Sequence, residues 1–181
     1  MSGPVTIDGR SLTIAQVEAV ARHGASVVIE DTARQRVAAT RRVVEDILAS
    51  GAVVYGINTG FGKLADTRIS SDELGQLQLN LLRSHACGVG EPFADEVVRA
   101  MLLLRANVLA TGHAGCRPEV VDAILDLLAS GIHPVVPCQG SVGASGDLAP
   151  LAHLALVLVG EGEAVVNGSR VAGAEALASA G

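Results

Sequence analysis

A run of small residues in this chain could build a reactive group from the backbone itself. Residues 140–154 form a glycine-rich segment that leads into an apolar helical pattern, and Ala144-Ser145-Gly146 lies near its start. Attack of the Gly146 amide nitrogen on the Ala144 carbonyl carbon would close a five-membered ring, and Gly146 has no Cβ to block the approach. Loss of water, including the Ser145 hydroxyl, then leaves an exocyclic methylidene. The triplet therefore predicts a carbon electrophile made from the chain.

A serine in such a loop could instead be a hydrolase nucleophile. The nucleophile elbow needs glycines two residues before and two residues after the serine. Around Ser145 these positions hold Gly143 and Asp147, and around Ser141 they hold Gln139 and Gly143. Neither serine fits, which disfavours hydrolysis. Asp147 is taken as a supporting residue of the loop, because a helix that opens there favours negative charge near the ring.

The sole tyrosine, Tyr55, opens the octapeptide Tyr-Gly-Ile-Asn-Thr-Gly-Phe-Gly, which ends at Gly62. Gly60, Gly62 and Ala65 partly match the dinucleotide-binding fingerprint, but the chain lacks the alternating strands and helices that this motif requires. A phosphate-binding P-loop also fails on spacing. The glycines give this segment conformational freedom.

Three stretches of the sequence together resemble the aromatic amino acid ammonia-lyases. They are residues 55–62, 80–90 and 140–163, and the resemblance extends from about Leu12 to Gly181. It implies that the triplet described above forms a 4-methylideneimidazole-5-one group, with no metal and no external cofactor. It further implies that Tyr55 acts as the base and that Gly62 lies at the substrate.

Within this resemblance, the pair Ser84-His85 occupies the substrate-selectivity position. Members that act on tyrosine or phenylalanine carry His-Leu or Phe-Leu there. A polar His85 can hydrogen-bond an imidazole nitrogen of the substrate, which an apolar pocket cannot do. The resemblance thus implies non-oxidative deamination of L-histidine to trans-urocanate and ammonia. A related aromatic lyase, an aminomutase with the same group, and a catalytically incomplete helical fragment remain as alternatives.

Composition limits the partners of the chain. The net charge is −6 over 181 residues, which disfavours nucleic acid because phosphate binding needs a basic patch. The longest apolar run, residues 154–159, is too short to cross a bilayer, and the start of the chain carries no secretory signal. We therefore expect a cytoplasmic protein with no membrane association. The resemblance adds a homotetramer as the expected assembly.

The remaining reactive side chains have ordinary interpretations. Cys87, Cys116 and Cys138 are odd in number and lack Cys-x-x-Cys spacing, so we expect free thiols and no structural zinc. His133 and His153 are expected to be structural. Residues 161–163, Glu-Gly-Glu, have the composition of a solvated turn.

The predicted fold is mainly α, with an N-terminal mixed region of short strands leading into a helical bundle that is incomplete. Aromatic residues make up 2% and hydrophobic residues 49%, so Ala, Val and Leu must build the core. We divide the chain at 1–110 and 111–181. Strands are expected at 5–9 and 52–56, a hairpin at 163–171, and helices at 13–22, 30–49, 71–88, 94–110 (with Val97, Met101, Leu104 and Val108 at helical spacing), 117–129 and after 147.

Overall fold

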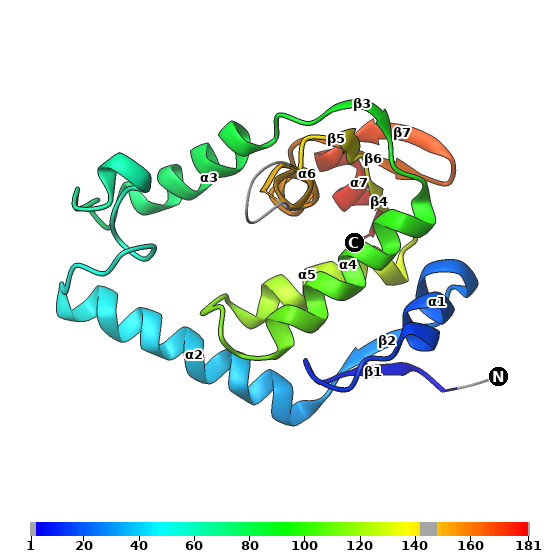
Figure 1. Cartoon of the computed structure of the whole chain (residues 1–181), viewed down its shortest axis with the longest axis horizontal. Helices are drawn as coiled ribbons and strands as arrows, with labels where there is room; N and C mark the ends of the chain where they lie inside the picture. The colour runs from blue at the N-terminus through cyan, green and yellow to red at the C-terminus, as the bar shows by residue number, and fades with distance from the viewer. Residues whose placement is uncertain (1–2, 142–147, 181) are drawn as a thin grey trace.

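The structure is a computed structural model that describes residues 3–141 and 148–180 (Figure 1). It is mainly α-helical with short strands, which confirms the predicted class. The helices of this part are α1 (Ile14–His23), α2 (Asp31–Ser50), α3 (Leu74–His85), α4 (Asp95–Ala110), α5 (Pro118–Ala129), α6 (Leu148–Leu158) and α7 (Gly173–Ala180), with a short 3₁₀ helix η1 (Gly62–Leu64). The strands are β1 (Val5–Ile7), β2 (Val27–Ile29), β3 (Val89–Pro92), β4 (His133–Pro134), β5 (Pro137–Gln139), β6 (Glu163–Val166) and β7 (Ser169–Ala172).

Local sequence explains where these elements begin and end. Thr13 caps α1 with a capping box, in which its hydroxyl accepts from the Gln16 N–H and the Gln16 side chain accepts from the Thr13 N–H. Gly24 ends α1 and Gly51 ends α2, both in the left-handed conformation that glycine adopts without strain. Pro118 opens α5, where its missing N–H costs nothing.

The strands form three small sheets. β1 and β2, which precede and follow α1 in the sequence, pair in parallel. β3 pairs antiparallel with β5. The third sheet has the order β4-β6-β7. Its β6–β7 hairpin turns at Asn167 and Gly168, both with positive φ, as a two-residue Asn-Gly turn requires. The hairpin expected from the sequence is confirmed.

The core centres on α4 and α5, which lie in the middle of Figure 1. α4 carries two apolar stripes. The stripe noted in the sequence, Val97, Met101, Leu104 and Val108, faces outward for the most part, with Leu104 47% exposed. The buried stripe is Val98, Leu102, Leu103, Ala106 and Leu109. Helical spacing therefore predicted the helix correctly but did not identify its core face.

The helices around this centre are tied to it by packing and by ion pairs, and Arg22 of α1 pairs with Glu96 of α4 at 3.0 Å. α2 packs on α4 and α5, α3 packs on α6, and residues 51–73 connect α2 to α3 at the left of Figure 1. The Arg34 guanidinium donates two hydrogen bonds to Asp122, at 2.8 and 2.6 Å, which joins α2 to α5. One hydrophobic cluster draws residues from Val5 to Ala176.

Candidate active site

The residues expected to form the electrophile, Ala144, Ser145 and Gly146, lie outside the described residues, as does Asp147. The two ends of their segment are described, and they come close together. A Cβ placed on Gly140 would lie 3.0 Å from the Cβ of Ala149 in the first turn of α6, and 2.9 Å from the Cα of Gly88. Gly140 and Ala149 therefore lie close to each other and to Gly88, just beyond the end of α3.

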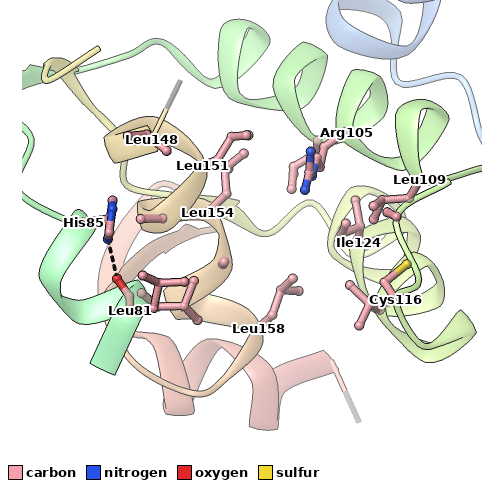
Figure 2. Close-up of a pocket in the computed structure, with 16 residues that line it drawn as sticks. Leu81, His85, Arg105, Leu109, Cys116, Ile124, Leu148, Leu151, Leu154 and Leu158 are labelled. Atoms are coloured by element: carbon pink, nitrogen blue, oxygen red, sulfur yellow. Dashed lines mark hydrogen bonds between the residues drawn. The ribbon is translucent and has the colours of Figure 1, made fainter. Parts of the chain in front are cut away.

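A cavity of about 410 Å³ opens next to this point, between α3, α4, α5 and α6 (Figure 2). Leu148 and Leu151 of α6 line it together with His85 of α3. The other lining residues are Leu81, Leu82, Leu102, Arg105, Leu109, Ala114, Cys116, Val120, Ile124, Ala152, Leu154, Ala155 and Leu158. A mostly apolar wall with a few polar groups is typical of a site for a small organic ligand.

His85 is the last residue of α3 and is half-buried. Its Nδ1 lies 2.8 Å from the carbonyl oxygen of Leu81, one turn earlier, as the dashed line in Figure 2 shows. A carbonyl oxygen only accepts, so Nδ1 must carry a proton. In the neutral ring this leaves Nε2 as an acceptor. The Ser84 hydroxyl lies 3.1 Å from the same Nδ1 and 2.9 Å from the Leu81 oxygen.

The strand expected at residues 52–56 does not form, and the side chain of Asn58 accounts for the difference. Asn58 is 4% exposed; its Oδ1 accepts from the Val54 N–H at 2.9 Å and its Nδ2 donates to the Ala52 carbonyl at 2.7 Å. These are backbone groups that a strand would offer to a neighbour. The main chain of Asn58 also accepts from the Ile69 N–H at 2.9 Å. The segment is thus a compact loop organised around one buried amide.

Tyr55 projects from this loop and is 62% exposed, with its ring edge-to-face against Phe61 at a centroid distance of 5.9 Å. Gly62 follows with positive φ and opens η1, and a Cβ on it would meet no described atom within 4 Å. Neither residue lines the cavity of His85. Within the described residues, the predicted site is therefore only partly assembled.

A second cavity, of about 790 Å³, lies between the Tyr55 loop and the first cavity, which His85 lines. Gly56 and Ile57 border it from the loop side. It shares Leu82, Ala114 and Cys116 with the first cavity, so the two spaces adjoin. The loop thus faces the His85 region across this second space.

Two contacts that sequence reasoning missed hold the end of α3 against α6 and the turn that follows it. The Arg83 guanidinium donates to both carboxylate oxygens of Glu161, at 2.9 and 2.6 Å, and this pairing lowers the pKa of Glu161. The Gly88 N–H donates to Nε2 of His153 at 3.1 Å. Glu161 therefore makes a contact with α3 that the composition of residues 161–163, typical of a solvated turn, did not predict. No short-range sequence pattern signals either contact, because each joins residues more than 60 positions apart.

The three cysteines form neither a disulfide nor a metal cluster among the described residues. Cys87, Cys116 and Cys138 are free, as expected. Burial raises the pKa of the Cys116 thiol, which disfavours its reactive thiolate form. Across residues 3–141 and 148–180, His, Cys, Asp and Glu do not gather in groups of three or more that could hold a metal ion. None of the helices in that part is long and apolar enough to span a membrane.

These features define a helical scaffold with an imidazole at the wall of an apolar cavity. The family model for aromatic amino acid lyases matches residues 12–181. The chain therefore belongs to the aromatic amino acid lyase family.

Individual relatives agree with this assignment. The chain is 58% identical over 177 residues to a histidine ammonia-lyase of Geobacillus thermodenitrificans, covering 98% of this chain and 35% of the relative. It is 64% identical over 134 residues to one of Geobacillus kaustophilus, covering 74% of this chain and 27% of the relative. The crystal structure of histidine ammonia-lyase from Trypanosoma cruzi superposes with a TM-score of 0.89 at 41% identity, over 98% of this chain and 34% of that one. The chain thus spans about a third of the length of the relatives that it matches.

Proposed function

We propose that the full-length protein containing these residues converts L-histidine to trans-urocanate and ammonia. The observation that carries the proposal is the geometry of His85 at the cavity wall. Its Nδ1–H is held by the Leu81 carbonyl, so a neutral ring presents Nε2 as a hydrogen-bond acceptor. An imidazole N–H of the substrate can donate to such an acceptor, whereas a phenyl ring cannot. Leaving that acceptor unpaired beside apolar side chains disfavours phenylalanine.

The group that the family resemblance implies fits the described surroundings of residues 144–146. Gly140 and Ala149 bring the two ends of the segment together, which suits a short loop compressed enough to cyclise. Formed from residues 144–146, a methylideneimidazolone would supply a carbon electrophile that makes the substrate amine a better leaving group. α6 begins at Leu148, so the N-terminal end of its dipole favours negative charge on that side.

Tyr55 is proposed to remove the β-proton of the substrate. Its loop borders a cavity that adjoins the one lined by His85. The hydrogen bonds of Asn58 keep the loop compact while Tyr55 and Gly62 stay exposed at its surface. Closure of this loop over the ligand would bring the phenol to the substrate and exclude water.

We further propose that the active protein is a cytoplasmic homotetramer. Twelve large apolar side chains of the described residues are exposed, including Leu104, Val108 and Val159. Contact with other subunits, or with the rest of the full-length chain, would remove these side chains from water.

Intact mass and product analysis test the proposal. Cyclisation with two dehydrations lowers the mass of the full-length protein by about 36 Da relative to its sequence. A catalytically incomplete fragment would show the unmodified mass. Purified protein is then incubated with L-histidine, L-tyrosine or L-phenylalanine, and the products are separated. Urocanate from histidine supports the lyase; a β-amino acid would identify an aminomutase, and a cinnamate product from tyrosine or phenylalanine alone would overturn the substrate assignment.

A further inference from the structure

The chain on both sides of His85 is held by α6 or by the turn that follows it. Two residues before His85, Arg83 pairs with Glu161. Three residues after it, the Gly88 N–H donates to His153. α3 ends at His85, so helix hydrogen bonding alone no longer fixes the backbone that follows. The Leu81 carbonyl holds the His85 ring within α3, and these two contacts, together with the packing of α3 on α6, hold that end of α3 in place beside the cavity.

The two contacts differ in strength. Arg83 and Glu161 have side chains that are 48% and 33% exposed, so water and salt screen their attraction. His153 is half-buried and lies within α6 itself, and its contact with Gly88 is less accessible to solvent. A higher salt concentration should therefore weaken the Arg83–Glu161 ion pair and leave the Gly88–His153 hydrogen bond intact.

The hydrogen bond requires His153 to be neutral at Nε2, since a protonated imidazole has no acceptor. Burial lowers the pKa of His153, which keeps the ring uncharged at neutral pH. With Nε2 accepting, the ring proton of the neutral form lies on Nδ1. The ring therefore acts as a fixed acceptor in this position.

Close packing supports the same conclusion. A Cβ on Gly88 would lie 3.0 Å from Nε2 of His153 and 3.2 Å from the Cβ of Pro137 in β5. Three segments thus meet at Gly88: the end of α3, the strand β5 and the second turn of α6. Gly88 is therefore closely surrounded three residues after His85.

We propose that His153 is a positioning residue for His85: by accepting the Gly88 hydrogen bond it fixes the end of α3 against α6, and so sets how the His85 ring faces its cavity. The consequence for substrate preference rests on the function proposed above. His153 need not touch the substrate. It acts through the backbone at Gly88, and its removal should weaken histidine binding more than it slows the chemical step.

The test compares His153→Gln, which keeps an acceptor oxygen close to the place of Nε2, with His153→Phe, which keeps the ring and removes the acceptor. His23→Phe, at an exposed position, is the matched control. In the full-length protein at neutral pH, amide exchange at Gly88 and the ring chemical shifts of His85 are measured by NMR. We expect His153→Phe to speed Gly88 exchange roughly tenfold and to shift the His85 resonances, while the other two variants stay within about threefold of the unmodified protein.

Turnover supplies the second readout. His153→Phe should raise KM for histidine roughly tenfold with a smaller change in kcat, and His153→Gln should restore KM. If the Phe variant does not fold, His153→Asn replaces it, because its shorter amide places the acceptor near Nδ1 instead of Nε2. The proposal would be overturned if His153→Gln showed the same Gly88 exchange rate and KM as His153→Phe or His153→Asn. Unchanged His85 resonances despite faster Gly88 exchange would also overturn it. Absence of histidine turnover in the unmodified protein would refute only the proposed function, since the NMR comparison tests the contact independently.

Discussion

Replacing Asn58 with alanine should loosen the Tyr55 loop without unfolding the protein. The substitution removes two side-chain hydrogen bonds, from the Val54 N–H and to the Ala52 carbonyl. Ala52 is exposed and Val54 is half-buried, so water can replace much of what is lost. We therefore count about 1 kcal/mol for each bond, near the usual net value, and not the larger cost of a fully buried unpaired group. The total of about 2 kcal/mol raises the population of the open loop roughly 30-fold.

Native-state hydrogen exchange measures this opening directly. The informative amides are those of Gly60, which donates to Thr67, and Ile69, which donates to Asn58. Both should exchange roughly 30-fold faster in Asn58→Ala, while the buried amides of α4 should change little, because no loop residue belongs to the described core cluster. Asn80→Ala, at an exposed position in α3, is the control. Exchange at Gly60 and Ile69 within about threefold of the unmodified protein would refute the role given to Asn58.

Two further predictions concern the scaffold. Leu102 is 1% exposed, so Leu102→Ala should lower the free energy of unfolding in urea by about 2–5 kcal/mol. Leu104, on the same helix, is 47% exposed, so Leu104→Ala should lower it by less than about 1 kcal/mol. Equal losses of stability would contradict the assigned core face. The backbone N–H groups of Ser11 and Arg10 lower the pKa of Asp8 from 3.8 to about 2, so its carboxylate contributes stability above the unfolded pKa that is lost as pH falls toward 2. Asp8→Asn should therefore flatten the pH dependence of urea unfolding between about pH 4 and pH 2, and an unchanged slope would contradict this assignment.

Sequence patterns predicted most helices because caps and apolar spacing are local. Thr13 with Gln16, Pro118, and the glycines that follow α1 and α2 all act within a few residues of the helix end that they define. The same reasoning missed β2 and β3, since strands of three or four residues depend on partners elsewhere in the chain. The division of the chain at residue 110 stays a prediction.

Other features could not be predicted because they depend on distant residues. The valines at 53 and 54 favour a strand, but the Asn58 amide takes the backbone groups that a strand would need. In α4, both stripes are apolar, so only the placement of α1 and α5 decides which one is buried. For the site, the sequence identified His85 and Tyr55 by residue type and motif. It identified His153 only as a structural histidine and gave no sign of its contact with Gly88, which lies 65 residues away.

The N-terminal strand carries a consequence for synthesis on the ribosome. Ile7 is fully buried, and the Gly9 N–H donates to the side chain of Asn107, 98 residues later. At about 5–20 residues per second, the first strand must wait roughly 5–20 s after its own translation before α4 emerges to cover it. During that interval the nascent chain exposes β1 and β2 without their permanent neighbours. The strands β1 and β2 are therefore buried only after α4 has been translated, and chaperones have time to bind them before that point.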